Sequence, residues 1–330
     1  MEAIDFVVPW VDGNDPEWRK KRNDYAEPDD DGGNCPERFR DWELFRYWFR
    51  AVEENAPWVG HIYLVTDHQL PHFLRTDHPK LKIVFHEEYI PAKYLPTFSS
   101  HTIELNMHRL PGLSEHFVYF NDDLFLNCRV KREDFFRNGK PCYSMIERPL
   151  EIGYPVSMIQ SIVLSDMGVV NRHFHRKETI RRPWLYANPR YGKWTFKNWL
   201  MLPFSTYQHF ADHHMPCPFL KSTLKEVWQA EEAVLDETCR HRFRAYGDVN
   251  QYLFRYWDIA RGNFAPWYER CDYFSVKPEN IAQCADSILK GAHPMLCLND
   301  SGEKAQFDAM CATLQKAFQT RYPQPCSFEK

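Results

Sequence analysis

The chain has 330 residues, 44% of them hydrophobic and 26% charged, a composition that excludes a disordered or collagen-like protein. The formal net charge of −4 leaves no basic excess to neutralise a phosphate backbone, so we expect no nucleic acid as a main partner. No apolar run approaches ~18 residues, and the N-terminus lacks the basic region of a signal peptide, so we expect no transmembrane segment. The ten scattered cysteines contain no CxxC pair, which indicates free thiols in a cytoplasmic protein.

Strand and helix patterns alternate over the first 130 residues. Short apolar runs predict strands at 4–10, 61–65, 81–85 and 117–120. Apolar residues at helical spacing predict helices over 39–52, 70–77 and 101–110. Such alternation favours βαβ units, so the expected fold class is α/β with a Rossmann-like, mostly parallel sheet.

The rest of the chain has a different pattern. Residues 128–190 are less regular and rich in Arg and Pro, and amphipathic helices are predicted over 219–238, 248–260 and 303–320. We therefore expect a single catalytic domain over 1–330. Its parts are an α/β half (1–130), an irregular insertion (131–195) and a mainly helical half (196–330) that packs on the first and completes the site.

Acidic residues follow two of the predicted strands. Asp12 and Asp15 come after the first strand, and Asp122 and Asp123 after the fourth. In open α/β sheets ligands bind beyond the carboxyl ends of the strands, so both clusters are expected on one rim. Adjacent carboxylates there suit Mg²⁺ or Mn²⁺ in contact with a diphosphate, and a solvated Asn-Asp turn is the alternative. We assign Asp123 to the metal and Asp122 to catalysis.

The loop WVDGNDP (10–16) combines turn residues, two acids and a tryptophan at the mouth of the first strand. Such a loop could hold a nucleotide base and ribose through Trp10, Asp12, Gly13 and Asp15. A tight surface loop explains the composition equally well.

Four ordered segments resemble the Stealth family of hexose-1-phosphate transferases. They are IDFVVPWVDGNDPEW (4–18), RFRDWELFRYWFRAVEENAPWVGHIYLVTD together with LPTFSSHTIELNMHRLPGLSEHFVYFNDDLFL (95–126), HHMPCPFLKSTLKEVW (213–228) and RAYGDVNQYLFRYWD (244–258). The family includes bacterial capsule-polymerising phosphotransferases and the catalytic subunit of the lysosomal-enzyme N-acetylglucosamine-1-phosphotransferase. The short interval between the second and third segments resembles the compact bacterial members.

The resemblance implies a fold of nucleotide-sugar transferase type and a sugar-1-phosphotransferase activity. The donor would be a UDP-sugar, with UDP-N-acetylglucosamine as the default, and the acceptor a hydroxyl of a glycan or polysaccharide. UMP would leave, a phosphodiester would form, and Mg²⁺ or Mn²⁺ would be the cofactor. The protein would be cytoplasmic, with peripheral association at the inner face of the membrane left open. Two alternatives stand beside this interpretation: a metal-dependent glycosyltransferase that releases UDP, and a non-catalytic carbohydrate-binding protein.

The resemblance also assigns two catalytic residues. His214 matches the family histidine of the third segment and would accept the proton of the acceptor hydroxyl. Arg244 matches the basic residue of the fourth segment and would contact the transferred phosphoryl group. Asp248 follows Arg244 at helical spacing and could orient its guanidinium, although an ordinary surface salt bridge has the same spacing.

Four further residues lie in segments that look like parts of the family pattern. Ser99, Ser100 and Glu104 would bind donor sugar hydroxyls or phosphate, and an ordinary helix cap is the alternative. Asp300, in CLND near the C-terminus, could join Asp123 at the metal or turn the chain.

Overall fold

The main sheet of the computed structural model, which describes residues 2–26, 39–211, 214–268, 270–302 and 306–330, has five strands in the order β10-β4-β1-β2-β3. Their bounds are Ile4–Pro9 (β1), Ile62–Thr66 (β2), Leu81–Phe85 (β3), His116–Tyr119 (β4) and Cys217–Leu220 (β10). The first four strands run parallel, and β10 is antiparallel to β4. The prediction of an α/β fold with a mostly parallel sheet is therefore confirmed.

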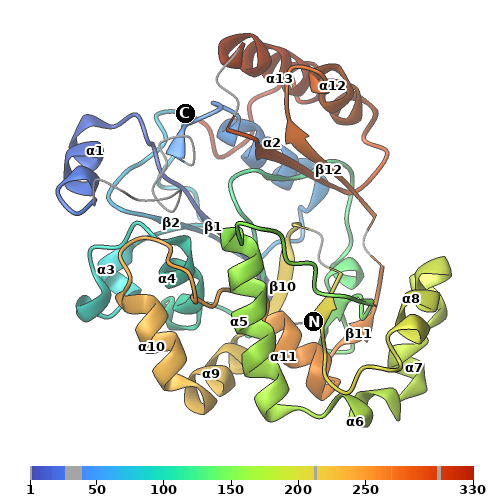
Figure 1. The fold of residues 1–330 in the computed structure, drawn as a ribbon. Coiled ribbons are helices and arrows are strands. Elements are labelled where there is room, and N and C mark those ends of the chain that lie inside the picture. Colours follow the sequence, from blue (N-terminus) through green and yellow to red (C-terminus); the bar gives the residue numbers. More distant parts are fainter. Residues whose placement is uncertain (1, 27–38, 212–213, 269, 303–305) are drawn as a thin grey trace.

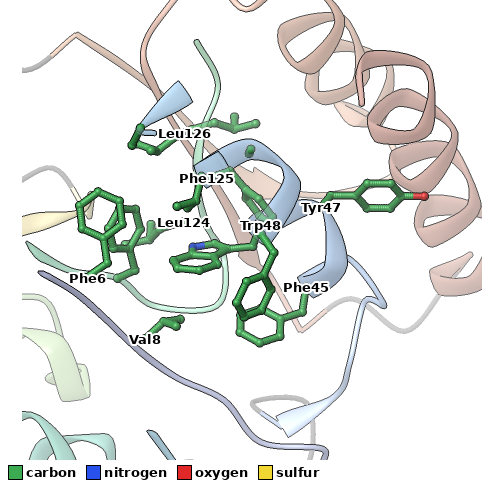
Figure 2. Packing of buried hydrophobic residues seen from close by; sticks show 14 of the residues in the cluster. Phe6, Val8, Phe45, Tyr47, Trp48, Leu124, Phe125 and Leu126 are labelled. Atoms are coloured by element: carbon green, nitrogen blue, oxygen red, sulfur yellow. The ribbon is translucent and has the colours of Figure 1, made fainter. Parts of the chain in front are cut away.

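Both faces of this sheet are buried, because neighbouring side chains of a strand point to opposite sides. Phe6 and Val8 of β1 belong to one hydrophobic cluster and Val7 to the other. On the first face lies α2 (Phe45–Asn55), whose Trp48 is fully buried and meets the Phe120 ring edge-on at 5.4 Å. Figure 2 shows Phe45 and Trp48 of this helix packed in one cluster with Phe6 and Val8 of β1 and with Leu124 and Phe125, which follow the acidic loop.

A second sheet completes this face and borders the acidic loop. It consists of β5 (Leu124–Leu126), β13 (Met295–Asp300) and β12 (Cys271–Val276), covered by α12 (Ile281–Lys290) and α13 (Phe307–Arg321). β13 pairs antiparallel with β5, with Cys297 opposite Leu124. Because β5 starts directly after the acidic residues, this register brings the end of β13 to them.

Helices cover the other face of the main sheet (Figure 1). They are α4 (Ser100–Leu105), α5 (Met158–His173), α9 (Lys221–Ala230), α10 (Glu232–Arg240) and α11 (Tyr252–Arg261). The shorter elements are α1 (Pro16–Asn23), α3 (His86–Tyr89), η2 (Ala92–Tyr94), η3 (Met107–Arg109), η4 (Arg132–Asp134), β6 (Phe136–Arg137), β7 (Lys140–Tyr143), β8 (Glu147–Arg148), α6 (Arg176–Ile180), α7 (Pro183–Tyr186), η5 (Pro189–Trp194), α8 (Thr195–Leu200), β9 (His209–Phe210) and β11 (Ala265–Pro266).

The structure corrects several predicted elements. The segment 131–195, expected to be irregular, contains the 16-residue helix α5. The helix expected over 219–238 is divided among β10, α9 and α10, so the third part of the chain is less helical than predicted. The helix expected over 39–52 begins at Phe45.

The helix predicted over 70–77 is wrong. This stretch forms turns, and its backbone pairs with the end of the chain: the amide of Arg75 donates to the carbonyl of Phe328 at 2.8 Å, and Leu74 bridges Glu329. Pro71 near its start removes an amide donor and favours a turn.

Two expectations of composition hold in the described part of the chain. No disulfide joins any two of its nine cysteines. None of its helices combines the length and the hydropathy needed to cross a bilayer.

Candidate active site

A cavity of about 360 Å³ lies at the carboxyl ends of the parallel strands. Its lining includes Trp10 after β1, Asp67 after β2, His86 after β3 and the residues 121–123 after β4. The chain passes from β1 to β2 on one side and reaches β4 on the other, so the switch point of the sheet lies between β1 and β4. This is where the ligand crevice of an open α/β sheet is expected.

One wall of the cavity is aromatic. The Trp10 ring stacks on Phe45 with centroids 5.8 Å apart and planes within 8°, and Trp18 packs against Phe39 and Phe98. Flat apolar side chains offer a stacking surface for a base or the face of a sugar ring. Trp10 therefore lines the cavity, and its contact with a nucleotide base stays a prediction.

The cavity lining also includes the acidic residues after β4. Asp123 places its Oδ2 atom 3.5 Å from Nε2 of His214 and 3.6 Å from Sγ of Cys297. Its Oδ1 atom is buried and has no hydrogen-bond partner among the described residues. Asp122 lines the cavity and is exposed to it. Loss of hydration, followed by the charges of Asp123 and Asp41, raises the pKa of Asp122 to about 7.

These donors fit a hard divalent cation. Among the described residues, those that line the cavity include five aspartates (41, 67, 122, 123 and 300) and two arginines (40 and 244). This excess of negative charge, together with the unpartnered oxygen of Asp123, favours a bound cation. Asp123, His214 and Cys297 also offer ligand atoms within 4.8 Å of one another. Because Mg²⁺ prefers oxygen ligands, Asp123 would hold it, and the adjacent Asp122, predicted above as a catalytic residue, would act there as a second carboxylate ligand.

His214 reaches the acidic loop through the pairing of β10 with β4. Cys217 lies opposite Tyr119, and the antiparallel register therefore places the residues before β10 beside those after β4. The imidazole is held at both nitrogens: Nδ1 lies 3.3 Å from the Tyr252 hydroxyl and Nε2 lies 3.1 Å from Nδ2 of Asn121. Burial opposes protonation of this ring, but the charge of Asp123 outweighs it and raises the pKa of His214 above its usual value.

Arg244 lines the same cavity and donates from Nη2 to Oγ of Ser100 at 2.7 Å. The helical spacing predicted between Arg244 and Asp248 is wrong, since these residues lie in a loop that contains Gly247 with a φ of +93°. The Asp248 carboxylate instead accepts from the backbone amide of Ala245 at 2.9 Å.

Two histidines hold this buried carboxylate from the other side. Asp248 accepts from Nδ1 of His101 at 3.0 Å and from Nδ1 of His241 at 2.7 Å. Asp248 therefore fixes the loop that carries Arg244, and Ser100 holds the guanidinium itself. Asp248 is a positioning residue, because it acts on Arg244 through the backbone of this loop.

The other predicted residues of α4 lie beneath the cavity. Ser99 is fully buried, and Glu104 accepts from the Tyr119 hydroxyl at 3.1 Å and from the Gln251 amide at 3.3 Å. Of this group, Ser100 lines the cavity.

The acids after β1 build the turn that leads into α1. Asp15 caps this helix by accepting from the amides of Glu17 and Trp18, and a hydrogen bond from Gln69 lowers its pKa. The amide of Asp12 donates to the same Gln69, and the carbonyl of Gly13 accepts from Arg19. These three residues shape the loop behind Trp10, as the tight-turn alternative predicted.

Asp300 lies in the cavity wall but is already paired. Both carboxylate oxygens accept from the Arg40 guanidinium at 2.5 Å, and Oδ2 also accepts from Trp42. A metal ligand at this position would require the pair to open.

Several residues of the cavity region were not predicted from the sequence, among them Arg40, Asp41, Asp67, His86, Tyr252 and Cys297. The strand-end rule identifies Asp67, which directly follows β2, and His86, which directly follows β3 and whose pKa burial lowers to about 4. The others depend on contacts between distant segments.

Comparison with known proteins identifies the family. The model of Stealth protein CR1, conserved region 1, matches residues 2–27, and that of Stealth protein CR2, conserved region 2, matches residues 38–143. The capsular polysaccharide phosphotransferase WcwK of Streptococcus pneumoniae is 42% identical over 337 residues, covering 100% of both chains. The chain belongs to the Stealth family.

Another full-length relative is the receptor polysaccharide phosphotransferase WefC of Streptococcus gordonii, which is 39% identical. The match covers 100% of this chain and 99% of WefC. Among solved structures, the WbbM bifunctional glycosyltransferase is a distant likeness, with a TM-score of 0.41, 10% identity, and coverage of 98% of this chain and 52% of that one. In this Stealth protein, the two matched regions contain β1 and β4, and hence both sides of the switch point.

Proposed function

We propose that this chain is a polysaccharide phosphotransferase that moves sugar-1-phosphate from a UDP-sugar to a hydroxyl of an acceptor glycan and releases UMP. The observation that carries the proposal is the meeting of Asp122, Asp123, His214 and Arg244 at one cavity of the switch point. Support comes from the full-length relatives, which are named capsular or receptor polysaccharide phosphotransferases.

The donor would lie across the cavity, with its base on the aromatic wall of Trp10 and its diphosphate between the acidic loop and Arg244. When bound at Asp122 and Asp123, Mg²⁺ or Mn²⁺ would offset the negative charge of the diphosphate. Ser100 keeps the Arg244 fork directed into the cavity. A guanidinium in this position stabilises the charge on the equatorial oxygens of the transferred phosphoryl group.

In the proposed reaction the acceptor oxygen forms a bond to the phosphorus that carries the sugar. The bond from that phosphorus to the bridging oxygen breaks, and UMP leaves with the electron pair. His214 accepts the proton of the acceptor hydroxyl, and the neighbouring Asp123 carboxylate stabilises the imidazolium that results. The imidazole is directed for this task by Tyr252 and Asn121.

We propose N-acetylglucosamine-1-phosphate as the first candidate for the transferred group. We also propose that the fold is of nucleotide-sugar transferase type. The test incubates the protein with UDP-N-acetylglucosamine, UDP-glucose and UDP-galactose, a panel of acceptor glycans and Mg²⁺, with a chelator in a parallel set. UMP release together with a phosphodiester signal in the phosphorus NMR spectrum supports the proposal. UDP release would assign the chain to the glycosyltransferases, and sugar binding without any nucleotide release would assign it to the carbohydrate-binding proteins.

A further inference from the structure

The short helix α8 presents its apolar side chains to solvent. Phe196, Trp199 and Leu200 share one face of this helix by their spacing and are 49, 62 and 65% exposed. Its polar Asn198 points the other way and is fully buried, donating to the carbonyls of Met145 and Tyr186. A surface helix of a globular protein normally has the reverse arrangement, with the apolar face inward.

The apolar surface continues on both sides of this helix. Trp184 on α7 is exposed, as are Leu202 and Phe204 in the turn after α8. Figure 1 shows α6, α7 and α8 together at one edge of the molecule, at the lower right. Contiguous exposed aromatic and aliphatic side chains of this kind mark interaction sites.

Positive charge surrounds the same surface. Between Arg172 and Phe204 the sequence has eight basic residues and one acidic residue, a formal charge of +7 in a chain of −4 overall. Two of the eight are neutralised by partners outside the segment: Arg172 pairs with Glu231, and the buried Arg176 pairs with Glu147. The ammonium groups of Lys193 and Lys197 lie 5.1 and 4.6 Å from the centre of the Trp194 ring. Lys193 is exposed and Lys197 is half-buried. Apolar rings and lysines are therefore interleaved on one surface.

We propose that this edge, built from α7, η5, α8 and the turn that follows, docks on the surface of a bilayer that contains anionic lipid. Trp199 and Leu200 enter the boundary between headgroups and acyl chains, and Lys193 and Lys197 contact the headgroups. The proposal is independent of the reaction assigned above, since it uses none of the cavity residues.

The chemistry of the surface favours a bilayer over the other occupants. An anionic polysaccharide would contact the lysines and could stack on Trp199, but it would leave the aliphatic side chains of Leu200 and Leu202 exposed to water. A second copy of the chain would bring the basic residues of both protomers together, Lys193 and Lys197 among them, which costs electrostatic energy. A bilayer interface accepts both the tryptophans and the lysines.

The test measures sedimentation of the full chain with vesicles of phosphatidylglycerol and phosphatidylcholine, and with vesicles of phosphatidylcholine alone. We expect binding to the anionic vesicles that weakens with salt. The double variant Trp199→Ser/Leu200→Ser should bind at least tenfold more weakly, through the loss of apolar burial. Lys193→Gln/Lys197→Gln should bind about thirtyfold more weakly.

Control variants remove an exposed leucine and two lysines elsewhere on the surface. Leu289→Ser alters a leucine that is 45% exposed on α12, and Lys20→Gln/Lys225→Gln changes the net charge by the same amount on α1 and α9. Both should bind like the unaltered chain. Thermal unfolding of every variant checks that the fold is retained.

Three results would overturn the proposal. The first is absence of vesicle binding by the unaltered chain at low salt. The second is a loss of binding in the lysine variant with none in the Trp199→Ser/Leu200→Ser variant, which would indicate an anionic polymer as occupant. The third is a dimer in light scattering that this apolar variant dissociates, without vesicle binding, which would indicate a second copy.

Discussion

Replacing Arg244 by lysine tests whether a planar fork, and not charge alone, acts at this position. In the unaltered chain, Nη2 of Arg244 donates to Oγ of Ser100 at 2.7 Å, and the other guanidinium nitrogens can contact the phosphoryl group. A lysine retains the positive charge but has a single nitrogen, which would have to serve both contacts. Losing one charge-assisted hydrogen bond costs about 1.5–3 kcal/mol, and losing a donor to transition-state charge costs about 2.7–4 kcal/mol. At about 1.4 kcal/mol per factor of ten, kcat should fall by about 10²-fold.

The assay for this variant is UMP release at saturating UDP-sugar, with circular dichroism to verify folding. Arg242→Lys is the matched control, since this neighbouring arginine donates from Nη1 to the Pro96 carbonyl at 2.6 Å and packs over the Tyr25 ring. We expect the control to stay within a factor of about three of the unaltered enzyme. If Arg244→Lys also stays within that range, the role of the fork is refuted.

The remaining predictions concern a base, a metal site and a buried histidine. His214→Ala should lower kcat by about 10²–10⁴-fold with little change in the donor Kd measured by calorimetry, and an intact kcat with a raised Kd would make His214 a binding residue. Asp123→Asn should abolish UMP release, as should excess chelator with the unaltered chain, and activity under either condition would exclude the metal site. In the same variant, the pKa of His214 measured by NMR should fall, because the charge of Asp123 raises it. Burial lowers the pKa of His108 from 6.5 to about 4. The unfolded chain therefore binds a proton at this histidine more readily than the folded chain does, and the free energy of unfolding declines as the pH falls from 6.5 towards 4. Between pH 7 and pH 4, the free energy of unfolding should therefore fall by about 3 kcal/mol less in His108→Gln than in the unaltered chain, as measured by urea unfolding. An equal fall in both proteins would contradict this.

The parts of the site that follow from local pattern and the strand-end rule could be predicted. Asp122 and Asp123 follow β4, and Trp10 follows β1, so the parallel sheet alone places them on one rim. The resemblance to the Stealth family supplied His214 and Arg244, which no periodicity distinguishes from other histidines and arginines. The pairing of β10 with β4 explains afterwards why His214 reaches the rim.

The parts that failed depend on contacts between distant segments. Cys297 reaches Asp123 because β13 pairs with β5, across a separation of 174 residues. Arg40 and Asp300, 260 residues apart, form a pair that no local pattern reveals. The predicted helix over 70–77 was overridden by pairing with the chain's last residues. Local propensity is a weak signal wherever such tertiary contacts compete with it.

The central claim is that the bond broken lies between phosphorus and oxygen within the donor diphosphate. A UDP-sugar labelled with oxygen-18 at the anomeric oxygen tests it most directly, because that atom joins the sugar to the transferred phosphorus. Our account predicts that the label remains in the phosphodiester product and that UMP leaves unlabelled, as read by mass spectrometry and by the isotope shift in the phosphorus NMR spectrum. Labelled UDP and an unlabelled glycan product would contradict it, since the label would then have left with the nucleotide after cleavage at the sugar carbon.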